Sequence, residues 1–322
     1  MQILVLNSGS SSIKFRLVEV VEEPSGLLTA RPALLQGAVK GIGSAASFEL
    51  MDHTGDRSTT TLEIRDHAHA LRVLLDRLTG SLDEIEAVGH RVVHGGDRFV
   101  KSTLITEEVE AEIDALSALA PLHNPSCLAG IRGARTALGP ALPMVAVFDT
   151  AFHQTMPQVA KQYALPVELA ERHRIRRYGF HGIAHASLAD GYAAYTGNPL
   201  EEIRLITVQL GNGCSVTAIA QGRSVETSMG FTPLEGLVMG TRSGDVDASI
   251  VGYLSDQEKV DVAEVDRWLN ERSGLLGLSG RSNDMRELLL AAERERDKGA
   301  EFAIDLFCYR ARKYLGAYLA VL

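Results

Sequence analysis

Residues 4–12 read Leu-Val-Leu-Asn-Ser-Gly-Ser-Ser-Ser, and residues 207–215 read Thr-Val-Gln-Leu-Gly-Asn-Gly-Cys-Ser. Each stretch has an apolar strand, a polar amide residue, a turn rich in Gly, Ser or Asn, and then the start of another strand. The shared plan predicts an internal duplication, with one copy in each of two domains. Two ordinary hairpins are the alternative, because Gly and Asn are common in turns.

Turns of this composition bind phosphate, because they expose several backbone N–H groups and hydroxyls in one concave place. The first runs from Asn7 to Ser12 and the second from Gln209 to Cys214. Neither is a Walker A loop or a dinucleotide fingerprint, since a strand and not a helix follows each of them. Lys14, two residues after the first turn, adds a positive charge. Two such turns facing each other would clamp a polyphosphate.

The composition sets further limits. A length of 322 residues predicts about two domains, and 45% apolar residues are normal for a globular protein with a sizeable core. A net charge of −9 argues against general affinity for nucleic acid or for an anionic membrane. The three cysteines are scattered, and no apolar run approaches the ~20 residues of a membrane span. We therefore expect a cytoplasmic protein without nucleic-acid or membrane partners.

Strands alternate with helices along the chain, which predicts an α/β fold. We expect domains at residues 1–150 and 151–322. The predicted strands are 1–6, 13–20, 33–39, 47–51, 87–89, 144–148, 205–208 and 215–220. The predicted helices are 67–78, 107–119, 248–254, 262–272, 284–296 and 298 to the end.

Two charged residues at strand ends are candidate site residues. Arg91 ends a strand and precedes a glycine pair, and its planar fork suits a carboxylate or a phosphate. A structural salt bridge to one acid is the alternative. Asp149 follows an apolar strand, where open α/β sheets place their ligands. An ordinary turn or N-cap acid is the alternative for Asp149.

Three further segments carry candidate donors. His123 follows a predicted helix end, where a histidine is commonly a capping or core residue. His181 and Arg242 lie in the glycine-flanked segments 178–182 and 239–245, which would let a ligand approach closely. Plain Gly-rich turns are the alternative for both. Phosphoryl transfer needs such a set of donors, because its catalysis is mainly positioning and charge neutralisation.

Zinc is the other chemistry that these residues suggest. His90 with His94, and His181 with His185, have i, i+4 spacing. Neither pair carries the adjacent Glu of a zinc protease motif. Cys214 lies in the second turn, but nothing near it marks it as a nucleophile.

The sequence resembles the acetate kinase family through six motifs, which occur in the family's order over essentially the whole chain. These are Asn-Ser-Gly-Ser-Ser-Ser-Ile-Lys (7–14), Gly-His-Arg-Val-Val-His-Gly-Gly (89–96), Phe-Asp-Thr-Ala-Phe-His (148–153), Arg-Tyr-Gly-Phe-His-Gly (177–182), Leu-Gly-Asn-Gly (210–213) and Met-Gly-Thr-Arg-Ser-Gly-Asp (239–245). The resemblance implies reversible, ATP-dependent phosphorylation of acetate to acetyl phosphate, with Mg²⁺ as cofactor. It also implies an actin-like (ribonuclease H-like) kinase fold of two duplicated domains, an active site in the cleft between them, and a homodimer.

The resemblance also implies residue roles. Arg91 would bind the substrate, Asp149 would be the catalytic acid, and His123, His181 and Arg242 would complete the catalytic set, with Asn7 near Mg²⁺. The nucleotide would contact Ser10, Ser12, Lys14, Gln209, Leu210, Gly211, Asn212, Gly213, Asp284, Met285 and Arg286. The acetate methyl group would enter a pocket of Val93, Leu122, Phe180 and Pro233. We expect direct in-line transfer. An acetate carboxylate needs no base, so Asp149 would instead orient Arg91 or the metal.

The sequence departs from the family at two places. Gln209 stands where the family usually has His, and Gln donates a hydrogen bond but carries no charge. The sequence also ends within an apolar helical pattern, before the family's last nucleotide loop and closing helix. We expect either a truncated chain or a truncated gene product, with reduced or no activity.

Three classes of function therefore compete. A carboxylate kinase comes first, for acetate or, with a different pocket, for propionate or butyrate. A truncated relative that binds phosphate without turnover comes second. Another actin-like protein, such as a sugar kinase or a chaperone ATPase, comes third, but it would not be expected to carry Arg91, His181 and Arg242 in these contexts.

Overall fold

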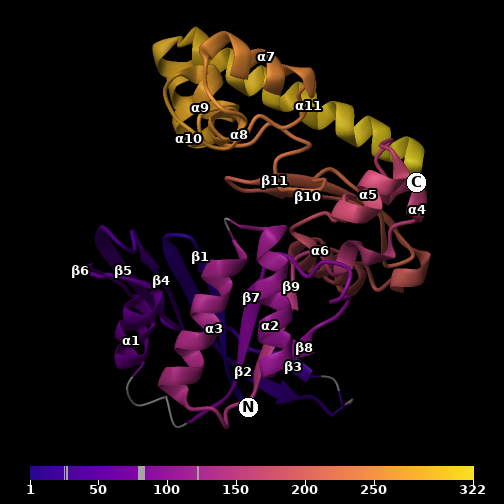
Figure 1. The fold of residues 1–322 in the computed structure, drawn as a ribbon. Helices are drawn as coiled ribbons and strands as arrows, with labels where there is room; N and C mark the ends of the chain where they lie inside the picture. Colours follow the sequence, from indigo (N-terminus) through magenta and orange to yellow (C-terminus); the bar gives the residue numbers. More distant parts are fainter. Residues whose placement is uncertain (25, 27, 79–83, 122) are drawn as a thin grey trace. The chain divides into compact units, whose positions relative to one another are not determined.

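The computed structural model describes residues 1–24, 26, 28–78, 84–121 and 123–322. The chain divides into two compact units, Met1–Ala151 and Phe152–Leu322 (Figure 1). Both units combine helices with β-sheet, which confirms the predicted α/β class. Among the described residues, every helix is too short or too polar to cross a membrane.

The first unit is built on a mixed sheet. Its described strands follow the order β6-β5-β4-β2-β1-β7-β9-β8, with β3 paired to β2. β1, β7 and β9 are parallel neighbours, whereas the other pairs are antiparallel. The elements are β1 (Gln2–Gly9), β2 (Ser12–Glu22), β3 (Leu28–Ala30), β4 (Leu35–Lys40), β5 (Ala45–Asp52), β6 (Arg57–Glu63), α1 (His67–Arg77), β7 (Ile85–Val92), β8 (Thr103–Leu104), α2 (Glu107–Ala115), a 3₁₀ turn (Leu116–Ala118), α3 (Asn124–Leu138) and β9 (Met144–Phe148).

One face of this sheet carries the core of the unit. Side chains alternate along each strand, so every second residue of β1 and β7 is buried, whereas their neighbours face the other side. α1 packs against β2, and α3 packs against β1 and β7. α3 approaches the sheet closely at Gly130, where a Cβ atom would lie 2.1 Å from Oγ of Ser8. A larger residue at position 130 would push the helix away from the end of β1.

Several predictions for the first unit are corrected. The segment after His123 begins helix α3, which the sequence reading missed because Asn124 and Pro125 resemble a loop. Pro125 fits there because the first helical positions need no hydrogen-bonded N–H. The first turn contains only residues 10 and 11, since Asn7 and Ser8 belong to β1. The prediction that Arg91 stands at the end of a strand is confirmed, because Arg91 is the penultimate residue of β7. The exposed strand β6 was not predicted.

The second unit has a three-stranded antiparallel sheet in its described part, ordered β10-β11-β12, with helices around it (Figure 1). Its elements are a 3₁₀ turn (Phe152–Thr155), α4 (Gln158–Lys161), α5 (Val167–His173), α6 (Gly182–Thr196), a 3₁₀ turn (Leu200–Glu202), β10 (Arg204–Leu210), β11 (Cys214–Ala220), β12 (Arg223–Thr227), α7 (Ser249–Glu258), α8 (Val262–Glu271), α9 (Gly274–Ser279), α10 (Met285–Leu290), a π-helical turn (Ala291–Glu295) and α11 (Lys298–Val321).

The predicted strands and the four predicted helices of this unit occur near their expected places. The elements α4, α5, α6, α9 and β12 were missed. α6 was missed because its apolar residues do not gather on one face, so no 3.6-residue period appears. The second turn is also narrower than predicted. Gln209 and Leu210 belong to β10, which leaves only residues 211–213 as the loop.

Candidate active site

Arg91 joins three parallel strands at one edge of the first unit. Arg91 on β7 lies beside Asn7 on β1, and Asp149 directly follows β9. The Arg91 guanidinium donates to Oδ2 of Asp149 from Nε at 3.1 Å and from Nη2, and its Nη1 donates to Oδ1 of Asn7 at 3.0 Å. The single acid partner that we named as the alternative for Arg91 is therefore present, and it is Asp149.

The pair is unevenly buried. The Asp149 side chain is 3% exposed and that of Arg91 is 31% exposed. Burial alone would lower the pKa of Arg91, but the charge of Asp149 outweighs it and holds this pKa above its ordinary value. Three of the five guanidinium hydrogens are used in these bonds, so one on Nη1 and one on Nη2 have no partner among the described residues. Arg91 is thus fixed, charged and able to bind an anion.

The residues around Arg91 take different positions. His90 faces the core with a buried Nε2, and its pKa is lowered to about 4 by burial and by the charge of Arg135. His123 directly precedes α3, and the next residue, Asn124, holds both the N–H and the carbonyl of His94. The substrate-pocket candidate Val93 is buried. Leu122, its predicted companion, lies outside the described residues.

Lys14 and Asn7 are cross-strand neighbours on β2 and β1. Both line an open pocket of about 670 Å³ on the sheet face that carries Arg91. Ser10 is exposed at the tip of the hairpin, and Ser12 begins β2. The structure therefore gathers the predicted nucleotide residues of this unit along one hairpin.

His181 and Arg242 meet at the Leu-Gly-Asn-Gly turn of the second unit. A Cβ atom on Gly213 would lie 3.5 Å from Nε2 of His181 and 3.3 Å from Nη1 of Arg242. Nη1 of Arg242 donates to the carbonyl oxygen of Pro233 at 3.1 Å. Arg242 has no acidic partner among the described residues, and burial lowers its pKa. These two predicted catalytic residues are thus brought together beside a predicted phosphate-binding turn.

The nucleotide candidates of this unit lie at the same turn. The Gln209 side chain lies over Gly211, where a Cβ atom would be 3.6 Å from its Nε2. Asn212 accepts a hydrogen bond from Asn283 at 2.9 Å. Asn283 precedes Asp284, which caps α10 and pairs with Arg286, and Met285 is the first residue of that helix. Asn283 is a contact that the sequence reading missed, although it directly precedes the predicted segment.

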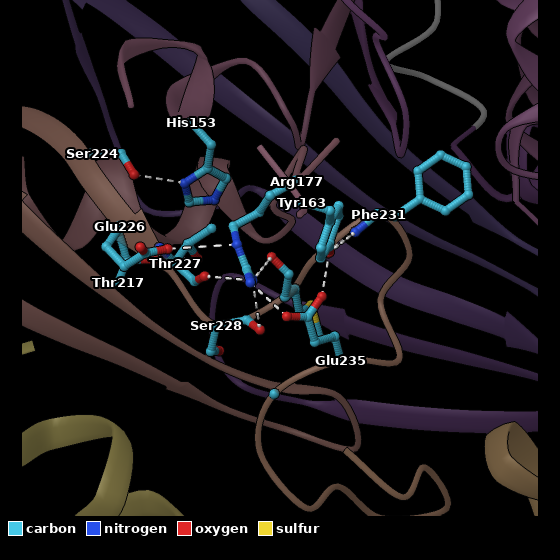
Figure 2. A network of polar contacts seen from close by, with 12 residues as sticks. His153, Tyr163, Arg177, Thr217, Ser224, Glu226, Thr227, Ser228, Phe231 and Glu235 are labelled. Carbon is cyan, nitrogen blue, oxygen red and sulfur yellow. Dashed lines mark hydrogen bonds and ion pairs between the residues drawn. The ribbon is translucent and has the colours of Figure 1, made fainter. Parts of the chain in front are cut away.

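A second group that the sequence reading missed centres on Arg177 (Figure 2). Its Nη1 donates to three consecutive carbonyl oxygens, those of residues 227–229, and its Nη2 donates to Oε1 of Glu235 at 2.5 Å. The Tyr163 hydroxyl donates to the other oxygen of Glu235 and accepts from the N–H of Phe231 at 2.9 Å.

We call Tyr163, Arg177 and Glu235 the loop clamp, since together they fix the segment that carries Pro233. Two signals in the sequence point to it: Arg177 opens the motif at 177–182, and Glu235 lies two residues after Pro233. Phe180, the remaining pocket candidate, is also buried.

The side-chain atoms of the candidate site limit which metal ions could bind there. No group of three or more His, Cys, Asp or Glu side chains suited to a metal occurs within the described ranges. His181 and His185, the spacing that suggested zinc, both contact Oγ of Ser215. Mg²⁺ bound with a nucleotide takes one or two protein oxygens and fills its shell with phosphate and water. Asn7 and Asp149 are oxygen donors of that kind, so they fit Mg²⁺.

Comparison with known proteins identifies relatives over the full chain. The model of the acetokinase family matches residues 2–322. The acetate kinase of Halothermothrix orenii is 49% identical over 330 residues, which cover 100% of this chain and 80% of that protein. The acetate kinase of Bacillus velezensis is 45% identical, and the match covers 99% of this chain and 80% of that protein.

Solved structures give the same result. A propionate kinase from Francisella tularensis superimposes with a TM-score of 0.91 at 42% identity, covering 100% of this chain and 80% of that one. Porphyromonas gingivalis acetate kinase gives 0.89 at 40% identity, covering 99% of this chain and 80% of that one. The likeness confirms the predicted actin-like kinase fold.

Proposed function

The chain belongs to the acetokinase family, and we propose that it transfers the γ-phosphoryl group of ATP reversibly to the carboxylate of acetate. The observation that carries the proposal is the state of Arg91. It is locked by Asp149 and Asn7, it remains charged, and it keeps two hydrogens for an anion. A short carboxylic acid offers little besides its charge, so a fixed guanidinium is the group best suited to bind it.

In the proposed mechanism, Arg91 binds the acetate carboxylate and orients one of its oxygens for attack. Asp149 acts on Arg91 and not on the substrate, because an ionised carboxylate is already a nucleophile. As the family resemblance implies, Val93, Leu122, Phe180 and Pro233 would contact the methyl group, and His123 would assist from its place before α3.

The second unit supplies the charge for the phosphoryl group. His181 and Arg242 neutralise its equatorial oxygens as the bond to ADP breaks, and transfer is in line. Gln209 to Gly213, with Ser10, Ser12 and Lys14, bind the nucleotide phosphates, and Asp284 to Arg286 contact the adenosine. Asn7 and Asp149 would hold Mg²⁺, which offsets phosphate charge when bound.

Acetyl phosphate formation tests the proposal. Purified protein is incubated with ATP, Mg²⁺ and acetate, and the product is trapped with hydroxylamine. Hydroxamate from the natural chain, even at a low rate, would support the proposal, and we expect almost none from Arg242→Gln. If no product forms while ADP still binds in titration calorimetry, the chain is a phosphate-binding relative without turnover.

Propionate is the second candidate substrate, because a propionate kinase is among the superimposed structures. The ratio of kcat/KM for acetate, propionate and butyrate decides between them. The proposal also includes a homodimer, which the family resemblance implies. It includes a cytoplasmic location as well, with which the scattered cysteines agree. Light scattering on the purified protein measures its mass directly.

A further inference from the structure

Three buried side chains form one hydrogen-bonded chain behind His181. Oγ of Ser215 lies 2.8 Å from Nδ1 of His181 and 2.7 Å from Nε2 of His185. Nδ1 of His185 lies 2.7 Å from Oγ1 of Thr207. Ser215, His185 and Thr207 are all buried, so these contacts are shielded from bulk water. The contacts form a single path from His181 to Thr207.

The local fold explains why these four residues meet. His181 precedes α6 and His185 lies one turn later, so both side chains lie on one face of the helix. Ser215 lies on β11 and Thr207 on β10. In the antiparallel register of these strands, Gln209 pairs with Ser215 and Thr207 pairs with Thr217. The side chains of Ser215 and Thr207 therefore lie on the same face of the hairpin. α6 packs on β10, so its histidines reach this face.

The Thr207 hydroxyl gives the chain a direction. It can donate to the carbonyl oxygen of Thr217, 3.5 Å away, and in that arrangement its oxygen accepts from Nδ1 of His185. Burial, with the charges of His153 and His181, lowers the pKa of His185 to about 3, so its ring carries one proton and its Nε2 is an acceptor. In this arrangement Ser215 donates to Nε2 of His185 and accepts from Nδ1 of His181.

The other nitrogen of His181 lies on the side of the ligand candidates. Nε2 of His181 and Nη1 of Arg242 are both next to Gly213. Titratable groups near the ring include Arg242 across the turn and His185 on its own helix. His153 packs against His185, with the two rings edge-on and their centroids 5.9 Å apart. His153 is itself held by Ser224 and by the carbonyl oxygen of Phe180.

We propose that Ser215, His185 and Thr207 are positioning residues, which hold Nδ1 of His181 as a donor and present its Nε2 to the transferring phosphoryl group. With Nδ1 held in this way, Nε2 donates to a phosphoryl oxygen only when the ring carries both protons. The working form of His181 is therefore the imidazolium, and kcat falls as rising pH removes the second proton. This inference rests on the proposed phosphoryl transfer.

Substitutions at Thr207 test the hydrogen bonds behind His181 and leave unchanged the residues assigned to binding or catalysis. Thr207→Val removes the hydroxyl at similar volume, and Thr207→Ser keeps it. We expect Thr207→Val to lower kcat by about tenfold or more, with little change in KM for ATP or acetate, and Thr207→Ser to retain most of kcat. The pH at which kcat falls should move in Thr207→Val and not in Thr207→Ser.

Thr217→Val is the matched control. Thr217 is a buried threonine on the adjacent strand, but its hydroxyl bonds to Thr227 and not to a histidine. We expect kcat and its pH dependence to remain close to those of the natural protein. An equal loss of kcat in Thr207→Val and Thr217→Val would overturn the proposal, because it would reduce the effect to a lost buried hydroxyl.

The tautomers can be read without turnover. In ¹⁵N-histidine-labelled protein, long-range ¹H–¹⁵N correlation spectra should show His185 protonated on Nδ1 at neutral pH, with the signal assigned from His185→Asn. His185 protonated on Nε2 would reverse the chain and overturn the inference. If the tautomer is as expected but acetyl phosphate never forms, the proposed function fails, and the inferred role of His181 fails with it. The hydrogen bonds from His181 to Thr207 would still be supported by the spectra.

Discussion

The guanidinium of Arg91 donates to a single oxygen of Asp149 from both Nε and Nη2. This geometry makes Asp149 a support for Arg91 and leaves the other edge of the guanidinium for a ligand. Two hydrogen bonds from one side of the guanidinium to one carboxylate oxygen fix the orientation of its plane, which a single hydrogen bond would not do. The role of Asp149 follows from this relationship, and five predictions test the site and the units that carry it.

Arg91→Lys should lower kcat/KM for acetate by about 10²–10³-fold, because lysine keeps the charge but lacks the planar fork. Steady-state kinetics of acetyl phosphate formation measure this loss. Arg98→Lys is the control, since Arg98 is 71% exposed and pairs with Glu112 at the surface. Equal kinetics for Arg91→Lys and the natural protein would contradict the assignment of Arg91.

Arg91→Ala should lower the free energy of unfolding by about 3 kcal/mol, the lower end for a buried pair, because Asp149 is left buried and unpaired. Adding Asp149→Asn should restore part of this loss, since the amide carries no charge. Urea unfolding of the two single variants and the double variant gives the coupling energy. Additive effects would show that the two residues do not stabilise each other.

Tyr163→Phe should destabilise the second unit by about 1–3 kcal/mol, because it removes two hydrogen bonds of the loop clamp and leaves the Phe231 N–H unsatisfied. KM for acetate should rise as well, since the clamp holds the segment of Pro233. Denaturant unfolding and kinetics measure both effects. Tyr195→Phe, at a side chain that is 89% exposed, should change neither.

Gln209→His should raise kcat by about fivefold at a pH where the new imidazole is protonated. A hydrogen bond from a charged donor is stronger than one from a neutral amide by about 1 kcal/mol. Kinetics across pH 5.5–8 show whether the gain disappears as the imidazole loses its proton. An unchanged rate at every pH would remove residue 209 from the groups that assist phosphoryl transfer.

The stability of the protein should fall as the pH drops from about 6.5 toward 4. His90 has its pKa lowered to about 4 in the fold, so in this range the unfolded chain binds a proton that the native protein does not. His90→Gln should reduce the slope of unfolding free energy against pH by up to about 1.4 kcal/mol per pH unit. His173→Gln, at an exposed histidine, should leave the slope unchanged.

Local patterns in the sequence were sufficient for much of the fold. The β1 and β2 hairpin, β9 and the helix ending at Arg77 have strong apolar periodicity, and the structure places them near the predicted residues. α3 and α6 were missed for local reasons. α3 starts with Asn124 and Pro125, which read as a loop, and the apolar residues of α6 surround the helix.

The sequence by itself determined the family and the identity of the candidate residues, because motif order along a chain needs no coordinates. Only the tertiary structure decided what these residues touch. Arg91 and Asp149 are 58 residues apart and meet because parallel strands end at one edge of a sheet. Ser215 joins His181 to His185 because α6 crosses a hairpin. Hydrogen bonds between distant segments depend on packing, and packing leaves no local pattern in the sequence.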